Sequence, residues 1–196
     1  MDIPSCHLDS ATRVKQGLNR ERQIADALKY QAGLPIEDAT GFEDRERKID
    51  RWIAYPGNRV ALQIKYRETG ADLLFEIYDK FYGWNDPKNK IGRDMIGDAT
   101  EYAVLLQDRK TVVMVPVAIA KRAIAIMLEG AQQRWTVEHP YGATFRYFAQ
   151  GVKLELKVQP DPRDGRPKMV AYIPSQYFAV AAQVQTYMVA LPNQWK

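Results

Sequence analysis

Two β-rich segments around a Pro-Gly turn constrain the fold of this chain more than any other part of its sequence. Residues 48–54 and 59–66 alternate between apolar and polar side chains, the period expected of strands with one buried face. Pro56 and Gly57 lie between them in a Tyr-Pro-Gly-Asn tetrapeptide, which suits a tight turn. The pattern therefore predicts an antiparallel hairpin.

The centre of the turn determines which residues of the two strands face each other. If it lies between Pro56 and Gly57, paired residues have numbers that sum to 113, and Asp50 is opposite Gln63. Lys65 is on the same face, because side chains two residues apart in a strand point the same way. The other face carries an apolar set that can pack on a core: Ile49, Ile53, Val60, Leu62 and Ile64. This apolar face supports the register.

Helices and strands are also predicted along the rest of the chain. A helix is expected over 17–31, where apolar residues including Leu18 recur at helical spacing, Asn19 is a candidate N-cap and Gly33 follows the end of the run. The charged stretch 37–48 lacks apolar periodicity and is expected to be a loop. Further strands are expected over 71–78, 102–106, 111–115, 145–148, 152–158 and 169–173, and further helices over 92–98 and 117–128.

Composition narrows the class of protein and of metal site. The net charge of +4, from 28 basic and 24 acidic residues, permits an anionic partner without identifying one. Cys6 is the only cysteine, which excludes an internal disulfide and a zinc site with two thiolates, so we expect a cytoplasmic protein. No signal peptide or membrane span is expected. With His7 and His139 the only histidines, a catalytic metal would need carboxylates and carbonyls.

Asp50, Gln63 and Lys65 form a set that suits phosphodiester hydrolysis. An Asp carboxylate with neighbouring oxygen ligands can hold Mg²⁺, which polarises a phosphate and lowers the pKa of an attacking water. Lys65 would orient that water or stabilise the charge that develops on the phosphate, and the sequence does not separate these two roles.

Asp50 is followed, after twelve residues, by Gln63-Ile64-Lys65. This order resembles the motif of PD-(D/E)XK (restriction-endonuclease-like) nucleases, and the resemblance covers roughly residues 17–128. The chain has the Gln-x-Lys variant, since Gln63 stands where Asp or Glu is more common, and Ile49 stands where the family has proline. The family often adds a glutamate from the first helix, and Glu21 matches it.

The resemblance implies a fold, a metal site and a reaction. It implies an α/β fold with a restriction-endonuclease-like core, in which a central mixed β-sheet is flanked by helices. It makes Glu21, Asp50, Gln63 and the Ile64 backbone carbonyl ligands of Mg²⁺ or Mn²⁺, with Lys65 assisting the water. The implied activity is a DNA endonuclease, and analogy with the family adds a homodimer. We expect residues 1–130 to form this core and 131–196 a β-rich extension packed on it as one compact domain.

Basic residues surround the motif, and two alternatives to a DNA nuclease stay open. The candidates for contacts with backbone phosphates are Arg47, Lys48, Arg51 and Arg67. Glu43, Asp44 and Glu46 are interleaved with them, so an ordinary solvated charged loop is the competing interpretation. The alternative functions are a catalytically inactive nucleic-acid-binding or assembly protein on the same scaffold, and an RNA-processing nuclease.

Overall fold

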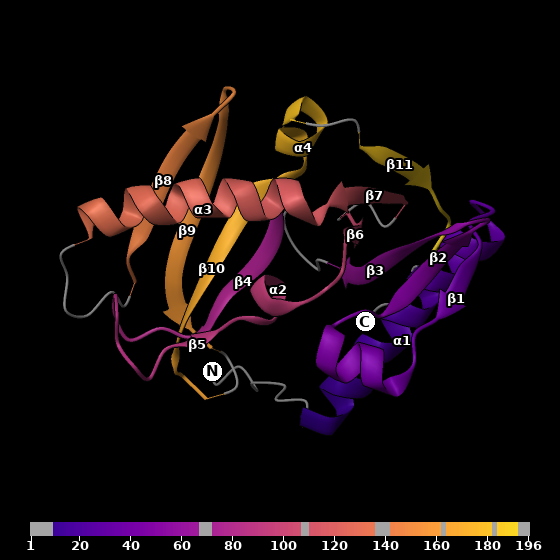
Figure 1. Ribbon diagram of the computed structural model, residues 1–196, viewed down its shortest axis with the longest axis horizontal. Coiled ribbons are helices and arrows are strands. Elements are labelled where there is room, and N and C mark those ends of the chain that lie inside the picture. Colours follow the sequence, from indigo (N-terminus) through magenta and orange to yellow (C-terminus); the bar gives the residue numbers. More distant parts are fainter. Residues whose placement is uncertain are drawn as a thin grey trace, which may run out of the picture.

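The computed structural model describes residues 10–66, 72–106, 110–135, 142–161, 164–181 and 184–191, and it has a mixed α/β fold (Figure 1). The helices are α1 (Ser10–Tyr30), the short π-helix η1 (Glu43–Arg47), α2 (Arg93–Ile96), α3 (Val117–Arg134) and α4 (Ser175–Ala181). Within the described residues the strands form two sheets, one of six strands and one of five. None of the described helices is both long enough and apolar enough to cross a membrane.

The six-stranded sheet, here called sheet A, contains the predicted hairpin. Its strands in spatial order are β1 (Ile36–Asp38), β2 (Arg51–Tyr55), β3 (Asn58–Tyr66), β6 (Glu101–Leu105), β7 (Thr111–Pro116) and β11 (Gln185–Met188). Strands β3 and β6 run parallel, whereas the other neighbours are antiparallel. The expected mixed sheet with accompanying helices is therefore confirmed.

The register of the β2–β3 hairpin is the predicted one. Ile53 pairs with Val60 and Arg51 with Leu62, so the paired numbers sum to 113. Gly57 has a φ of 75°, a left-handed conformation that glycine adopts without a steric penalty. The local alternation and the turn residues were sufficient to fix this part of the fold.

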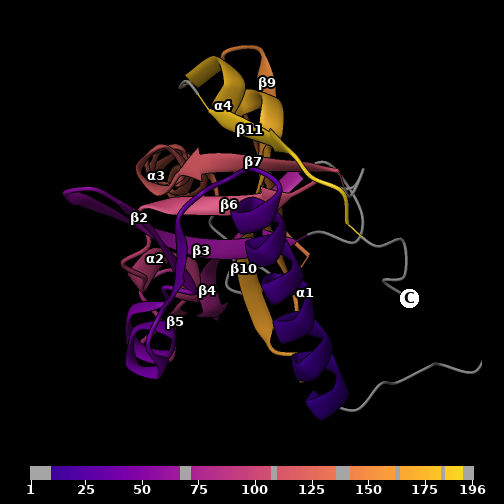
Figure 2. The ribbon, with the colours of Figure 1, turned by 90° about the vertical axis from the view of Figure 1, so that its right-hand side faces the viewer.

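Helix α1 covers one face of sheet A (Figure 2). Ile24 and Leu28 of α1 pack in one core cluster with Leu62 and Ile64 of β3. The prediction was wrong at the start of the helix, because α1 begins before Asn19, which therefore cannot be its N-cap. Leu18, expected on the buried stripe, is exposed.

The charged stretch 37–48 is not simply a loop, as the sequence had predicted. It contains most of β1, which pairs antiparallel with β2, and the π-helix η1. Both elements are short, and neither produces an apolar repeat, because β1 buries only Ile36 and η1 buries no side chain. Lys48 ends η1 with a φ of 58° and turns the chain towards β2.

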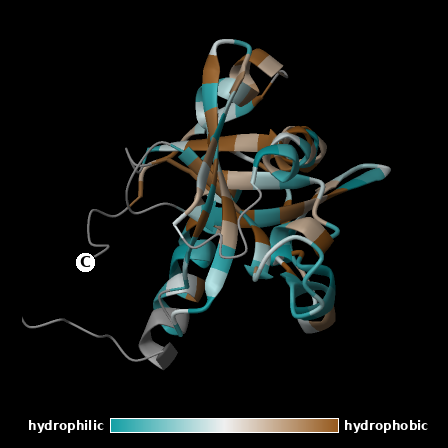
Figure 3. Cartoon of the chain, turned by 90° about the vertical axis from the view of Figure 1, so that its left-hand side faces the viewer, coloured by the Kyte–Doolittle hydropathy of each residue, from teal (hydrophilic) through white to brown (hydrophobic). Residues whose placement is uncertain are grey.

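The five-stranded sheet, here called sheet B, joins the middle of the chain to its C-terminal part. Its strands in spatial order are β5 (Lys90–Ile91), β4 (Asp72–Lys80), β10 (Pro167–Pro174), β9 (Val152–Pro160) and β8 (Thr144–Ala149). All neighbouring pairs are antiparallel. Figure 3 shows brown and teal bands alternating along strands, as expected when one face is buried.

A second core lies between the two sheets and α3. Phe75 of sheet B and Tyr102 of sheet A belong to it, with their ring centroids 5.1 Å apart, and α3 contributes Ile124 and Met127. The sequence predicted β8, β9 and β10, but not β5, α4 or β11. The strands beyond residue 130 are hydrogen-bonded to earlier ones, β10 to β4 and β11 to β7.

Candidate functional site

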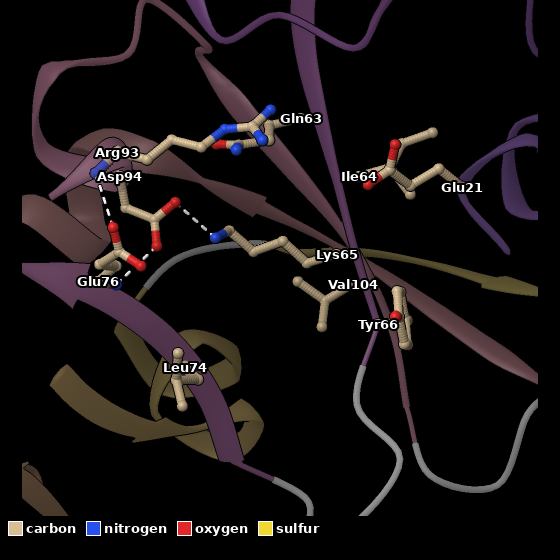
Figure 4. Close-up of a pocket in the computed structure, with 10 residues that line it drawn as sticks. All are labelled: Glu21, Gln63, Ile64, Lys65, Tyr66, Leu74, Glu76, Arg93, Asp94 and Val104. Carbon is tan, nitrogen blue, oxygen red and sulfur yellow. Dashed lines mark hydrogen bonds and ion pairs between the residues drawn. The ribbon is translucent and has the colours of Figure 1, made fainter. Parts of the chain in front are cut away.

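A pocket of about 340 Å³ lies where α1, β3, β4, α2 and β6 meet. Its lining includes Glu21, Gln63, Lys65, Glu76 and Asp94, drawn as sticks in Figure 4. The structure thus gathers three of the predicted side chains around one pocket. Two more acids line the same pocket: Glu76 from β4, which the sequence had offered as a possible further metal ligand, and Asp94 from α2, which it had not.

Asp50 is buried beside this pocket, and its two carboxylate oxygens have different partners. Its backbone N–H donates to the Leu62 carbonyl at 2.9 Å, although Leu62 is the register partner of Arg51, so Asp50 lies just beyond the regular pairing of β2 with β3. Oδ2 accepts the Ile64 backbone N–H at 2.7 Å, and Oδ1 accepts a hydrogen bond from Arg93 at 3.0 Å. The carboxylate is therefore held by a backbone donor and by one guanidinium.

On balance, the surroundings of Asp50 disfavour the ionised form of its carboxyl group. Burial raises the pKa of Asp50, and the hydrogen bond from Ile64 and the charge of Arg93 lower it by less, so the net shift is upward. A carboxylate in such a place would gain from a further cation, because its present partners do not fully offset the cost of burying its charge.

Gln63 is the second buried polar group of the hairpin. Its side chain is 4% exposed, and its amide oxygen Oε1 accepts no hydrogen bond from any described residue. A buried acceptor without a partner costs about 1–3 kcal/mol, so such atoms are rare and call for an explanation. A cation or an ordered water at this oxygen would remove that cost.

Lys65 is directed to a partner that the sequence did not identify. Its Nζ lies 2.5 Å from Oδ1 of Asp94, whose other oxygen accepts the Glu76 backbone N–H at 2.6 Å. The Tyr102 hydroxyl donates to the Asp94 carbonyl at 3.2 Å, and Lys65 lies 4.9 Å from the centroid of the Tyr102 ring. Lys65 is thus held by a buried acid, rather than by direct contact with Asp50.

A glycine brings Asp94 close enough to reach Lys65. The Gly92 N–H donates to the Ile77 carbonyl of β4 at 2.7 Å. A Cβ at Gly92 would collide with the backbone of Glu76, so only glycine allows α2 to approach β4 this closely. No local sequence pattern indicates this contact, since α2 is four residues long and far from Lys65 in sequence.

Glu21 lies across β3 from Lys65. In Figure 4, Glu21 and Ile64 are drawn on one side of the β3 ribbon, and Gln63 and Lys65 on the other. Burial first, and then the negative charge of Asp50, raise the pKa of Glu21 to about 7, while Arg93 acts in the opposite direction. The two carboxylates therefore repel each other in the absence of a cation.

Glu76 is occupied by contacts inside the protein. Its carboxylate forms an ion pair with Lys168 of β10 and accepts the Arg93 backbone N–H at 3.3 Å. These contacts connect the pocket to sheet B and leave Glu76 poorly placed to serve as a metal ligand.

The predicted phosphate-binding residues have local acidic or carbonyl partners. Arg47 pairs with Asp98 at 2.8 Å, Arg51 pairs with Asp38 at 3.0 Å, and Lys48 donates to the Arg45 carbonyl. Arg67 lies outside the described residues.

Arg93 is a basic residue of the site that the sequence did not indicate. Besides its contact with Asp50, it lies 3.7 Å from Asp44, and 43% of its side chain is exposed. A half-exposed guanidinium that lines the pocket can bind a phosphate.

The oxygen atoms near β3 are of the chemical type that a hard divalent cation prefers. Within the described residues, no group of three or more His, Cys, Asp and Glu side chains is arranged to hold a metal. Asp50, Glu21 and the free amide oxygen of Gln63 are nevertheless oxygen donors, which Mg²⁺ prefers, and Mg²⁺ in proteins often keeps several waters beside one or two carboxylates.

Comparisons with known proteins find no match to this chain among family models, curated proteins or solved structures.

Proposed function

We propose that this protein is a divalent-metal-dependent DNA endonuclease of the PD-(D/E)XK type. Its main support is the buried amide oxygen of Gln63, which has no partner among the described residues and belongs to a strand whose neighbour presents Asp50. A stable fold rarely leaves such an atom unpaired, and a cation held by this oxygen, Asp50 and Glu21 would satisfy it and offset the repulsion between the two acids.

Each ligand in this proposal has its own contribution to the metal site. Asp50, Gln63 and Glu21 would hold Mg²⁺ or Mn²⁺, together with the Ile64 backbone carbonyl. When bound, the cation would polarise the phosphate and lower the pKa of a water. The Ile64 N–H orients the Asp50 carboxylate, so that its remaining lone pairs have a fixed direction.

Lys65 and Arg93 would act on the phosphate and the water. Asp94 fixes the ammonium group of Lys65 at the pocket, where it would donate hydrogen bonds to the attacking water or to a phosphate oxygen. Arg93 would exchange its contact with Asp50 for a phosphate oxygen of the substrate once a cation neutralises Asp50. A homodimer, expected from the family, would place two such sites on opposite DNA strands, and light scattering would test it.

The proposal is tested by cleavage of supercoiled plasmid, branched DNA and single-stranded RNA in Mg²⁺ or Mn²⁺, with EDTA as a control. Asp50→Ala and Lys65→Ala should each lose at least about a thousandfold in rate, corresponding to about 4 kcal/mol of transition-state stabilisation.

Asp161→Asn is the matched control, because Asp161 is as buried as Asp50 but does not line the pocket. Its partner Lys168 meets the pocket only through Glu76, to which the proposal gives no catalytic role. The Asp161→Asn protein should cut at the wild-type rate. Binding without cutting on every substrate would instead favour the inactive scaffold, and cleavage of RNA alone would favour the RNA-processing nuclease. Activity that survives both Asp50→Ala and Lys65→Ala would show that another site does the chemistry.

A further inference from the structure

The face of sheet B that points away from the second core is basic. Along β9, Leu154 and Leu156 point into the core, and Lys153, Glu155 and Lys157 alternate with them on the outer face. Strands β8 and β10 extend this face by register, because their paired side chains share a face with those of β9.

Three cations on this face surround a single carboxylate. Glu155 accepts ion pairs from Arg146 at 3.2 Å, Lys153 at 3.1 Å and Lys157 at 2.9 Å. Their side chains are 65%, 53% and 37% exposed, in the same order. Asp72 lines the same surface hollow as Lys153 and Glu155, so two acids stand against three bases. The cluster therefore keeps an excess of positive charge towards solvent, which suits a polyanion.

Two aromatic rings lie among these cations. Phe148 of β8 is 68% exposed and pairs directly with Lys153. Tyr172 of β10 pairs with Glu155, and Lys157 lies 4.7 Å from the centroid of its ring. An exposed Phe side chain on a strand is not stabilised by packing in the core. Unpaired bases, however, stack on flat aromatic rings that lie beside basic side chains.

The basic face leads directly to the candidate pocket. One row across the sheet runs from Arg146 through Glu155 and Tyr172 to Leu74, each paired with the next. Leu74 lines the pocket with Lys65. Because neighbouring strands are about 4.8 Å apart, the row spans only about 15 Å, or a few nucleotides of an extended strand.

We propose that this outer face of sheet B binds a single-stranded segment of nucleic acid and directs the adjoining phosphodiester into the candidate pocket. Arg146, Lys153 and Lys157 contact the phosphates, and Phe148 and Tyr172 stack on bases. The second part of this proposal, delivery of the phosphodiester to the candidate pocket, rests on the proposed nuclease function. It narrows the substrate to nucleic acid with an unpaired segment beside the cut, such as a flap, an overhang or a fork.

The test is fluorescence anisotropy of the full-length protein in EDTA, where binding is measured without cleavage. The probes are a labelled single-stranded DNA of about 20 nucleotides, an RNA of the same sequence, and the DNA duplex. We expect the single strands to bind at least about tenfold more tightly than the duplex, with an affinity that falls steeply with salt, by a slope of about −0.7 for each phosphate contact. Preference for DNA or for RNA identifies the polymer.

Two variants and two controls assign the binding to this face. Arg146→Glu with Lys153→Glu should weaken single-strand binding at least about tenfold and reduce the salt slope, and Phe148→Ala should weaken it about tenfold. Arg59→Glu replaces an exposed, salt-bridged arginine of sheet A, and Tyr30→Ala removes an exposed ring of α1. Both should bind as the wild type does, and melting curves check that every variant folds.

The outcomes separate this inference from the nuclease proposal. Equal binding of duplex and single strand, or variants that bind like the controls, would overturn the sheet B inference even if Asp50→Ala abolishes cleavage. Single-strand binding that the face variants weaken, in a protein that cuts nothing, would retain the binding face and reject the nuclease.

Discussion

Strand β3 of sheet A and strand β9 of sheet B place their polar side chains in opposite ways. In β9 the polar residues point outwards, and the inner face is entirely apolar. In β3 four consecutive residues, including Gln63, are buried. Helix α1 packs on one face of the strand, and on the other face Lys65 contacts Asp94 of α2 and lies beside the ring of Tyr102. A polar residue on β9 is solvated at little cost, whereas one on β3 must find a partner inside the protein.

The ion pairs of the two sheets differ in the same way. The cations around Glu155 are largely exposed, and such surface pairs contribute at most about 1 kcal/mol each. Lys65 and Asp94 are 18% and 4% exposed, so breaking this pair leaves a charge with little water around it. The polar groups whose burial costs the most free energy are thus gathered at the β3 pocket, where a bound ligand would offset that cost.

Among the substitutions that test this difference between the two sheets, we expect the largest effect from Asp94→Asn, which removes the charge of the buried acid at the β3 pocket. The amide has the same size but no charge, so Lys65 loses its ionic partner and its fixed position. Single-turnover cleavage should slow by about 10- to 100-fold, the range typical of residues that orient a catalytic group.

Two measurements distinguish loss of positioning from loss of structure. DNA affinity and the Mg²⁺ concentration for half-maximal rate should stay within about twofold of wild type, since Asp94 touches neither ligand. Asp161→Asn, which removes the equally buried acid beside sheet B, should cut normally. A rate within twofold of wild type for Asp94→Asn would mean that Lys65 is positioned without it.

The sequence was sufficient for the hairpin but not for its surroundings. The alternation of 48–66 and the Pro-Gly turn determine the register locally, so the residue pattern alone predicts the pairing of Arg51 with Leu62 and of Ile53 with Val60. The regular pairing of β2 with β3 begins at Arg51, so the prediction that Asp50 lies opposite Gln63 falls just outside it. It does not predict the partners of these residues, because Arg93 and Asp94 approach through a four-residue helix that gives little periodic signal.

The sequence also did not predict which strands belong to the same sheet. The strands β8, β9 and β10 were predicted from their own periodicity, but the pairing of β10 with β4 is a non-local contact across about 90 residues. Helical spacing placed Glu21 correctly on α1, and Ile24 and Leu28 of the predicted stripe are buried, while Leu18 at its start is exposed. Local pattern thus identified the elements, and tertiary packing decided their faces.

A smaller effect is expected from Gln63→Glu. This substitution adds a charge to the buried β3 pocket, whereas a charge on the outer face of β9 is solvated. A third carboxylate beside Asp50 and Glu21 should raise the affinity for Mg²⁺ about tenfold and lower the melting temperature in EDTA, because like charges repel without the cation. The melting temperature as a function of Mg²⁺ concentration measures both effects, through the linkage of binding to stability.

The matched change on the other sheet is Gln159→Glu. Gln159 of β9 is partly exposed and accepts a hydrogen bond from Tyr172 at 2.9 Å, so an added charge there is solvated. Its melting temperature should not depend on Mg²⁺ differently from wild type. A Gln63→Glu protein that is equally indifferent to Mg²⁺ would contradict the metal site.

The smallest effect concerns pH, and it separates two partly buried acids of α1 and sheet A, Glu21 and Glu101, from Glu155 of sheet B, which is surrounded by cations. The pKa values of Glu21 and Glu101 are both raised to about 7, in Glu101 by burial alone. A raised pKa means that each acid favours the folded state most below its ordinary value of 4.5, and that this stability is lost as pH rises towards 7. The cations around Glu155 lower its pKa to about 2, so its contribution is present at neutral pH and is lost only in strong acid.

Melting curves between pH 4.5 and 8 therefore distinguish Glu21 from Glu101. Glu101→Gln should flatten the fall in melting temperature by a few degrees with or without Mg²⁺, since Glu101 lies among apolar residues such as Ile53 and Met114. Glu21→Gln should flatten it in EDTA but much less in Mg²⁺, because a bound cation would already hold Glu21 ionised. If Mg²⁺ leaves the two variants indistinguishable, Glu21 is only a buried acid like Glu101, and the metal ligands on β3 act without it.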